Sequence, residues 1–320
     1  MNAPKKLTGL RPQAYEHPSD KAALNALSRT RGLDTLVSKL NEWGIEPFLR
    51  VQLTGSYIHV LPDNFPDLTE RLTTACETLD IPTVPDLYIY GSGEINAATA
   101  GVKHPLVYLT SAAIEALTPE ELLFVTAHEV GHIKSGHVLY YQIADIFPEI
   151  MGLIFDFPGG GIISAGLQIA LLSFKRSSEF TADRAGLLAC QDVEVALRAL
   201  MKLAGLPAKY HSAINTADFI RQAHDFEAMD SGKLNLVAKY LSIAGATHPW
   251  TVMRAQQLLS WIDSGGYEAI LNAPLNPVPQ LPAGTVAFCI RCGCPLHGGE
   301  LFCSKCGQPV AHPVGGPKES

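Results

Sequence analysis

Charged residues are scarce in this sequence, and positive charge is the scarcer sign. Only 17% of the 320 residues are Asp, Glu, Lys or Arg, and 24 Lys and Arg stand against 31 Asp and Glu, which gives a formal net charge of −7. Nucleic-acid-binding surfaces need an excess of Lys and Arg to neutralise phosphates, so the composition argues against a nucleic-acid partner. Apolar residues make up 47% of the chain, which excludes a disordered or fibrous protein and can fill a sizeable core.

The sequence also lacks the marks of a secreted protein. No apolar run of signal-peptide length follows the basic residues at the N-terminus. The seven cysteines do not form the framework of a small disulfide-rich domain, since Cys76 and Cys190 stand alone and the other five lie between Cys289 and Cys306. We expect the two lone cysteines to be buried as small hydrophobic residues, and the protein to be intracellular, in a reducing cytoplasmic setting.

Hydrophobic spacing predicts an α+β protein that is mostly helical, with a small sheet. The expected elements are helices with an amphipathic face between Leu24 and Leu40, a strand over 51–60, a helix from 67, strands over 86–90 and from 95 to 109, and helices from 118 to about 261. The expected divisions are an N-terminal helical and strand region (1–85), a core (86–271), a proline-rich linker (272–286), a cysteine-rich module (287–310) and a tail (311–320).

A helix with two histidines one turn apart is the strongest motif. Thr118 and Glu121 form a capping box with proline between them, so a helix begins here and continues through His132. His128 and His132 then share one face, as two imidazoles must to reach a single zinc ion. Glu129 stands next to the first histidine and could act as general base toward a zinc-activated water. A chance match is the alternative, and the strongly capped helix argues against it.

A catalytic zinc site usually needs a third protein ligand. The next histidine, His137, would lie about 140° around the helix from His132, which favours a surface or supporting role. Glu179 and Asp183 are four residues apart on a second predicted helix, so they share a face. Glu179 could complete a site of two histidines and one carboxylate, and Asp183 could orient a ligand imidazole. An exposed carboxylate pair is the alternative.

Three motifs in this order resemble those of the HtpX-like and CAAX-prenyl-protease-like zinc metallopeptidases, a gluzincin group that also contains the mitochondrial inner-membrane stress protease. They are His-Glu-x-x-His at 128–132, Arg-x-x-Glu-x-x-Ala-Asp at 176–183, and His248-Pro249 with Arg254 behind it. The resemblance covers residues 15–265, including a segment around His17-Pro18-Ser19-Asp20 that looks like soluble members. It implies a gluzincin-type core, a catalytic zinc held by His128, His132 and Glu179, and Asp183 supporting a ligand.

The resemblance also implies roles at the substrate side of the site. His248 would donate to the oxyanion of the tetrahedral intermediate, and Arg254 would orient the site or contact substrate. Asn96 and Ala97 resemble the start of an edge strand that pairs with the backbone of a polypeptide substrate, although the following residues 98–101 depart from the family's pattern. Protein quality control is a process that this resemblance suggests.

Residues 150–174 are the most apolar stretch between the two zinc motifs, at a place where several relatives have transmembrane helices. Asp156, Pro158 and three glycines cut it, and the run that remains, 162–174, is shorter than a membrane span. We therefore predict a helical hairpin beside the active site. Capping of the substrate site, contact with a membrane surface and membrane insertion remain alternatives.

Two matched Cys-x2-Cys-Gly knuckles lie near the C-terminus. Their four thiolates suit a closed tetrahedral site, so we predict a structural zinc in a zinc ribbon held by Cys289, Cys292, Cys303 and Cys306. Cys294 could substitute for one of these, although the paired spacing disfavours it. A disulfide pair and a dithiol redox module are the alternatives. The module carries no basic patch, so we expect a protein partner here and no nucleic acid.

The leading hypothesis from these residues is a zinc-dependent metalloendopeptidase. Zinc lowers the pKa of a bound water, Glu129 takes its proton and passes it to the leaving amine, and His248 helps to stabilise the oxyanion. The rival is a non-catalytic, metal-stabilised scaffold that recruits partners through its zinc ribbon. Glu129 argues against the rival, because a purely structural metal site has no use for a general base.

Overall fold

The computed structural model describes residues 3–43, 45–102, 104–228, 249–273, 287–288 and 295–296. The first third of the chain contains α1 (Pro12–Tyr15), α2 (Pro18–Ser28), α3 (Leu33–Trp43), α4 (Ile45–Ser56), β1 (Ile58–His59), α5 (Pro66–Thr78), β2 (Asp86–Tyr90), β3 (Ala97–Ala100) and β4 (Leu106–Thr110). The rest of the described chain is helical: α6 (Ser111–Ala116), α7 (Pro119–Ser135), α8 (Val138–Ile154), α9 (Gly160–Cys190), α10 (Val193–Leu203), the 3₁₀ helix η1 (Ala208–Ala213), α11 (Thr216–Ala228), α13 (Thr251–Asp263) and α14 (Gly266–Leu271). The predicted mostly helical α+β class is confirmed.

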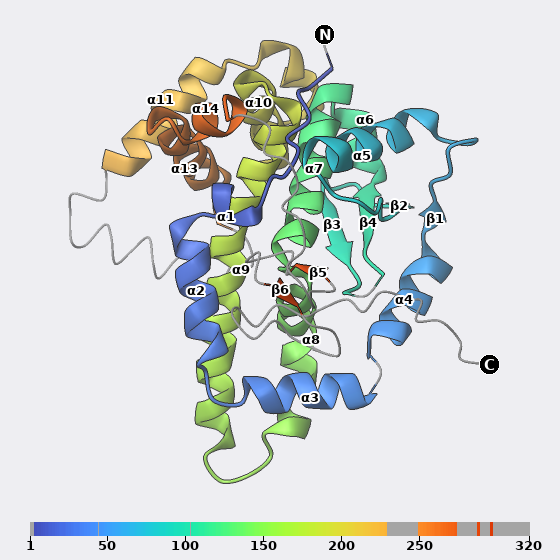
Figure 1. The fold of residues 1–320 in the computed structure, drawn as a ribbon, viewed down its shortest axis with the longest axis vertical. Helices are drawn as coiled ribbons and strands as arrows, with labels where there is room; N and C mark the ends of the chain where they lie inside the picture. Colours follow the sequence, from blue (N-terminus) through green and yellow to red (C-terminus); the bar gives the residue numbers. More distant parts are fainter. Residues whose placement is uncertain are drawn as a thin grey trace.

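A small mixed sheet lies against α7, with strand order β1-β2-β4-β3 (Figure 1). β2 and β4 run parallel, with Asp86 opposite Leu106, while β3 pairs antiparallel with β4 and forms one edge of the sheet. The predicted single strand from 95 to 109 is therefore wrong. Gly101, at a φ of +82°, turns the chain back between β3 and β4, a conformation that side chains rarely adopt.

The strand predicted over 51–60 is also wrong in most of its length. α4 continues to Ser56, and only Ile58 and His59 pair with β2. Leu53 and Tyr57, four residues apart, pack against a small apolar cluster that includes Tyr88 of β2. This helical spacing suits the packing surface offered by the sheet, and tertiary contacts override the strand-like composition.

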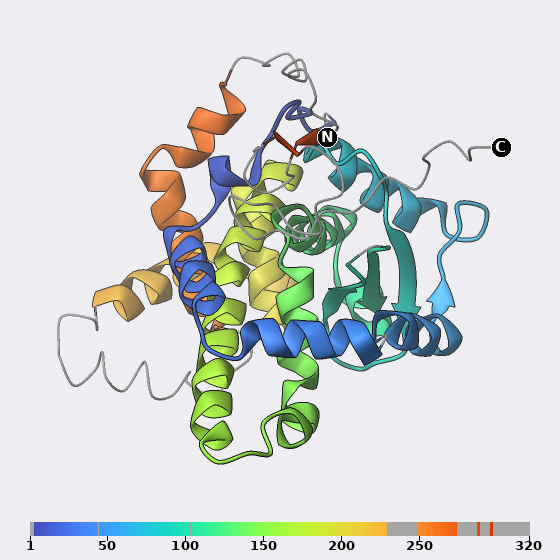
Figure 2. The same ribbon diagram turned by 60° about the horizontal axis from the view of Figure 1, so that its bottom comes forward.

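Two helices, α7 and α9, run side by side through the centre of the molecule in both ribbon views (Figures 1 and 2). Glycines allow their close approach: a Cβ built on Gly131 would lie 2.5 Å from the Cβ of Ala185, and one on Gly186 would lie 2.8 Å from the ring of Phe124. One apolar core surrounds the upper part of this pair, and a second lies between α2, α3, α8 and α9. The crossing therefore places functional side chains of α7 and α9 within reach of one another.

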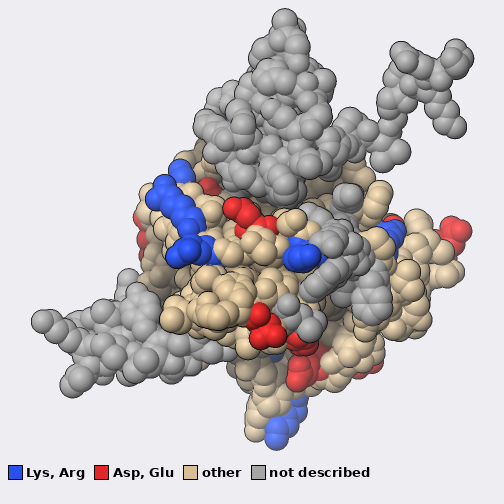
Figure 3. Space-filling view, turned by 90° about the horizontal axis from the view of Figure 1, so that it is seen from below, with Lys and Arg blue, Asp and Glu red and all other residues tan. Residues whose placement is uncertain are grey.

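α8 and α9 form the helical hairpin predicted over 150–174. Large exposed apolar side chains lie at this end of the hairpin: Met151 on α8, Phe157 in the turn, and Ile162 and Ile169 on α9. In the parts of the chain that are described, no helix combines the length and the apolar character needed to cross a bilayer. On the face of the molecule that holds the end of this hairpin, the visible Lys and Arg side chains are interspersed with Asp and Glu (Figure 3).

The predicted zinc ribbon falls largely outside the described residues. The four predicted zinc ligands Cys289, Cys292, Cys303 and Cys306 (hereafter the ribbon cysteines) lie outside them, as does Cys294. Two short strands of the module are described, β5 (Ala287–Phe288) and β6 (Pro295–Leu296), and they pair antiparallel. In the sequence, these strands flank the first Cys-x2-Cys knuckle.

Candidate metal centre

The predicted capping box fixes the start of the motif helix. The side chain of Thr118 accepts a hydrogen bond from the backbone N–H of Glu121 (3.3 Å), and the carboxylate of Glu121 accepts one from the backbone of Thr118 (2.8 Å). Lys202 of α10 donates to the same carboxylate at 2.6 Å, which pairs the buried charge. α7 is thus anchored nine residues before its first histidine.

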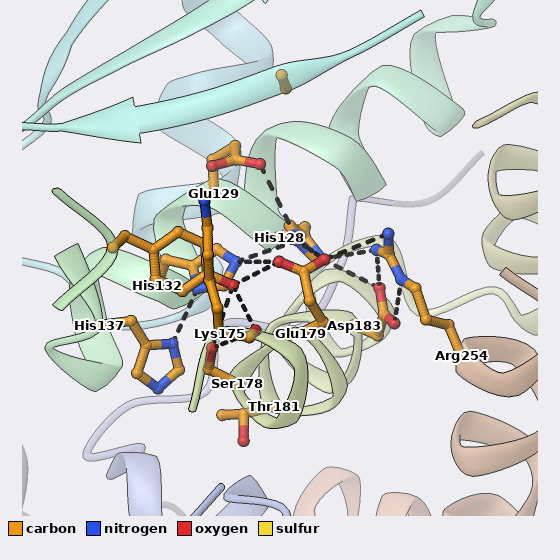
Figure 4. A network of polar contacts seen from close by, with 12 residues as sticks. His128, Glu129, His132, His137, Lys175, Ser178, Glu179, Thr181, Asp183 and Arg254 are labelled. Carbon is orange, nitrogen blue, oxygen red and sulfur yellow. Dashed lines mark hydrogen bonds and ion pairs between the residues drawn. The ribbon is translucent and has the colours of Figure 1, made fainter. Parts of the chain in front are cut away.

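The two histidines of α7 lie one turn apart, as the spacing predicts. His128 and His132 are 6% and 2% exposed, and their Nε2 atoms lie 3.2 Å apart. Burial holds the pKa of His132 down to about 3, so its imidazole is neutral at pH 7 and has a lone pair to offer a metal. Both rings turn toward α9 (Figure 4).

α9 brings the carboxylate of Glu179 to these rings. Oε2 of Glu179 lies 3.5 Å from Nε2 of His128, and Oε1 lies 3.5 Å from Nε2 of His132. Glu179 is 1% exposed, so the alternative of an exposed carboxylate pair is wrong. Among the described residues, these three side chains form the group of His, Cys, Asp and Glu that could hold a metal ion.

The spacing of the three ligand atoms fits a zinc ion. Two ligand atoms of a tetrahedral zinc site, each about 2.0–2.1 Å from the ion, lie about 3.3 Å apart. The two Nε2 atoms lie 3.2 Å apart, and each lies 3.5 Å from one of the two carboxylate oxygens of Glu179, so these separations have this size. Two imidazoles and one carboxylate also form a donor set that catalytic zinc sites use, with a position left for water or substrate.

Asp183, one helical turn beyond Glu179, orients the first histidine. Its Oδ1 lies 3.0 Å from Nδ1 of His128, so Nε2 is the atom turned to the metal position. Arg254 of α13 donates to both carboxylate oxygens, at 2.8 Å to Oδ2 and 2.6 Å to Oδ1. Burial by itself would raise the pKa of Asp183, but the Arg254 guanidinium outweighs it and holds that pKa below its usual value.

The neighbouring carboxylates also change the pKa of His128. Burial lowers the pKa of His128, but the hydrogen bonds to Asp183 and Glu179 outweigh burial and raise it to about 9. Nη1 of Arg254 lies 3.3 Å from Oε2 of Glu179, so the arginine also contacts a predicted ligand. Arg254 is 7% exposed, and its guanidinium contacts His128, Glu179 and Asp183 of the site.

The site contains one residue that the sequence spacing did not reveal. The hydroxyl of Tyr141, on α8, donates to Oε1 of Glu179 at 2.5 Å, and its ring lies 4.6 Å from that of His132. The amine of Lys175 lies 5.0 Å from the centre of the Tyr141 ring. Tyr141 has no helical spacing relation to either zinc motif, so only the packing of α8 on α9 could reveal it.

The metal position opens into a cleft of about 1120 Å³. Glu129 lies on its wall, between the three ligands and a strand of the sheet, with Oε1 4.0 Å from Nε2 of His128 (Figure 4). The predicted substrate residues Asn96 and Ala97 line the same cleft, at the start of β3. His248 lies outside the described residues, but Pro249, the next residue, lines the cleft.

Comparison with known proteins gives one family and several relatives. The model of peptidase family M48 matches residues 62–262. The plastoglobule-localized metallopeptidase 48, chloroplastic, of Arabidopsis thaliana is 32% identical over 260 residues, which cover 81% of this chain and 75% of the relative. Protease HtpX homolog 2 of Methanosarcina acetivorans is 29% identical over 177 residues (48% and 60%), and a protease HtpX homolog of Ralstonia pickettii is 26% identical over 215 residues (58% and 71%). No solved structure matches.

Proposed function

This chain belongs to peptidase family M48 and is a metalloprotease, and from that premise we propose that it is a zinc-dependent endopeptidase that cuts polypeptides in an extended, unfolded state. His128, His132 and Glu179 would hold the catalytic zinc, and Glu129 would be the general base. The observation that carries this proposal is the convergence of two buried imidazoles, with Nε2 atoms 3.2 Å apart, on the carboxylate of Glu179, whose two oxygens each lie 3.5 Å from one of them, beside the Glu129 carboxylate on the cleft wall.

Glu129 would move the proton in the reaction. When bound, zinc activates a water and polarises the scissile carbonyl. The carboxylate of Glu129, 6% exposed and on the cleft side of the ligands, is placed to take the proton of the attacking water and to return it to the leaving amine. A general base of this kind contributes about 10² to 10⁴-fold to the rate. A non-catalytic scaffold would have no use for this carboxylate, so the protease is favoured.

We propose that His248 donates to the oxyanion that forms on the scissile carbonyl. Support comes from its neighbour in sequence, because Pro249 and Thr251 line the cleft. Arg254, at the start of α13, would support the metal site and would not contact the substrate. Its bidentate pair with Asp183 supports a role in holding the carboxylate that orients His128.

The substrate would pair with β3 by adding a strand to the sheet. Asn96 accepts the backbone N–H of Thr110 and donates its own to the Thr110 side chain, so its backbone groups point to β4. By the alternation of an antiparallel ladder, the carbonyl of Ala97 and both backbone groups of Thr99 point to the outer edge. Only an extended chain can form such a pairing, which supports unfolded proteins, and hence quality control, as the substrate class.

The test is cleavage of casein by the wild type and by Glu129→Gln, with zinc content measured in both. We expect the wild type to cut, and the zinc-loaded variant to lose at least about 10²-fold in rate. Glu268→Gln, an exposed glutamate of α14, is the matched control and should cut like the wild type. Equal cutting by Glu129→Gln would rule out the general-base assignment. If neither protein cuts while zinc is bound, the scaffold hypothesis regains support.

We also propose that the ribbon cysteines hold one structural zinc and present a docking surface to a protein partner. Support comes from the antiparallel pairing of β5 with β6, which brings together the residues on either side of the first knuckle. Replacing Cys303 and Cys306 by serine should lower the zinc content from two ions to one per chain, while casein cleavage per catalytic zinc is kept. An unchanged zinc content would contradict the ribbon.

A peripheral contact with a lipid surface is proposed for residues 150–174. Ile162 and Ile169 are 82% and 68% exposed on one face of α9, and Phe157 in the turn is 50% exposed. One relative is named for plastoglobules, which supports a lipid surface over a protein cap on the cleft. Ile162→Asp with Ile169→Asp should reduce flotation with phosphatidylcholine vesicles. Val51→Asp, at a side chain 72% exposed on α4, should not.

A further inference from the structure

The second histidine of the metal centre is held by a chain of buried polar groups. Nε2 of His132 faces Glu179, while Nδ1 lies 2.9 Å from Nδ1 of His137 (Figure 4). His137 is fully buried, at 0% exposure. The expectation of a surface position for it is therefore wrong, and the alternative of a supporting group agrees with its contact.

The end of α7 explains how His137 reaches this place. A continuous helix would carry His137 far around from His132. Instead α7 ends at Ser135, and Gly136 adopts a left-handed φ of 72°, which favours glycine. The backbone N–H of His137 then donates to the carbonyl of His132 at 3.0 Å, and the chain turns back over its own last turn.

Asp20 lies at the other end of His137. Nε2 of His137 lies 3.0 Å from Oδ2 of Asp20, an ion-pair distance without the alignment of a hydrogen bond. Asp20 is 0% exposed, and Thr181 of α9 donates to the same oxygen at 2.7 Å. A carboxylate this deeply buried is costly unless it is paired. Asp20 belongs to α2, in the segment around His17 to Asp20, outside the 62–262 matched by the family model.

If His132 is a metal ligand, the proton positions in this series of polar groups are fixed. If Nε2 of His132 gives its lone pair to a metal, Nδ1 must carry the proton and donate it to His137. Nδ1 of His137 is then an acceptor, so its own proton sits on Nε2, which faces the Asp20 carboxylate. Each ring nitrogen has one role, and the Asp20 carboxylate ends the series as the negative group that faces the N–H of His137.

We propose that His137 and Asp20 are positioning residues of the metal centre, which fix the tautomer and the ring orientation of His132. His128 contacts a carboxylate directly, that of Asp183. His132 contacts the imidazole of His137 instead, and the carboxylate of Asp20 lies on the far side of that imidazole. Helix α2 therefore completes the zinc site from outside the family core. The proposal rests on His132 as a zinc ligand, as assigned under the proposed function.

The test measures zinc affinity by competition with a chelator, on the full chain, without any need for turnover. His132→Gln identifies which of the binding events is the catalytic site. His137→Phe and Asp20→Leu should each lower the affinity of that site about 10 to 100-fold. The double variant should lose no more than either single variant, because the two residues act through one chain of contacts. Asp34→Leu, an exposed acid on α3, is the matched control and should bind like the wild type.

Asp20→Asn keeps the proposal testable if the larger changes prevent folding. Its amide keeps a polar oxygen opposite Nε2 of His137 but loses the negative charge, so its zinc affinity should lie between those of the wild type and Asp20→Leu. Two results would overturn the proposal in favour of a packing role for both residues. One is a loss of zinc affinity in the double variant equal to the sum of the single losses, and the other is a zinc affinity of Asp20→Asn as low as that of Asp20→Leu. If His132→Gln binds zinc at both sites as tightly as the wild type, His132 is not a zinc ligand. This result would overturn the ligand assignment whatever the cleavage assay with Glu129→Gln shows.

Discussion

Gly131 of α7 faces Ala185 of α9 with no room for another carbon: a Cβ built on Gly131 would lie 2.5 Å from the Cβ of Ala185. Ala185 is six residues, less than two helical turns, from Glu179, so the distance between the two helices also sets the distance between Glu179 and the two histidines. The close crossing is what allows the two halves of the ligand set to meet.

Gly131→Ala should therefore weaken both the fold and the site. Overpacking at such a contact costs about 1–3 kcal/mol, and the separation of α9 should lower zinc affinity as well. Gly166→Ala in α9 is the control, because a Cβ there meets nothing within 4 Å, and alanine favours a helix over glycine by up to about 1 kcal/mol. Urea unfolding of the zinc-free proteins measures the stability of both variants. Equal midpoints for Gly131→Ala and the wild type would contradict this account.

Arg254→Met should destabilise the zinc-free protein strongly. It removes the bidentate partner of Asp183, whose carboxylate is 0% exposed, and leaves a buried charge that costs about 3–5 kcal/mol. The control is Arg221→Met, since Arg221 pairs with Asp218 at the surface and such pairs contribute little. Urea unfolding again provides the comparison. If the two variants lose the same small amount, Asp183 is stabilised by something other than Arg254.

Tyr141→Phe should lower zinc affinity about tenfold while leaving the fold intact, because it removes only the hydroxyl that donates to Glu179. The ring that packs on His132 is kept. Tyr210→Phe, at a tyrosine 49% exposed on η1, removes a hydroxyl of the same kind away from the ligands. Chelator competition with both variants checks the prediction, and a wild-type affinity for Tyr141→Phe would remove the hydroxyl from the site.

Thiol labelling should separate the cysteines into three classes. Burial raises the pKa of Cys76 and of Cys190 to about 12, so few of these thiols ionise at pH 7.5 and both should react only after denaturation. The ribbon cysteines should be protected while zinc is bound and react once a chelator is added. Cys294 should react in both states. A zinc-loaded protein in which the ribbon cysteines react at once would contradict the second zinc site.

The proposed ligands could be found in the sequence because their spacing is a local property of helices. The capping box at Thr118 sets where α7 begins, and 3.6 residues per turn then places His128 and His132 on one face whatever surrounds them. The same rule placed Glu179 with Asp183. The strand-like composition of residues 51–60 gave a wrong prediction, because Leu53 and Tyr57, four residues apart at helical spacing, pack on the sheet.

The sequence by itself thus determined the family, the types of the proposed ligands, their spacing within each helix, and Glu129 as the proposed base. Tertiary structure alone decided the contacts between helices. His137 turns inward only because Gly136 ends α7, Tyr141 reaches Glu179 from α8, and Asp20 arrives from α2. These contacts depend on the angles and distances at which helices pack, which are set by side chains far apart in the chain and have no fixed sequence period.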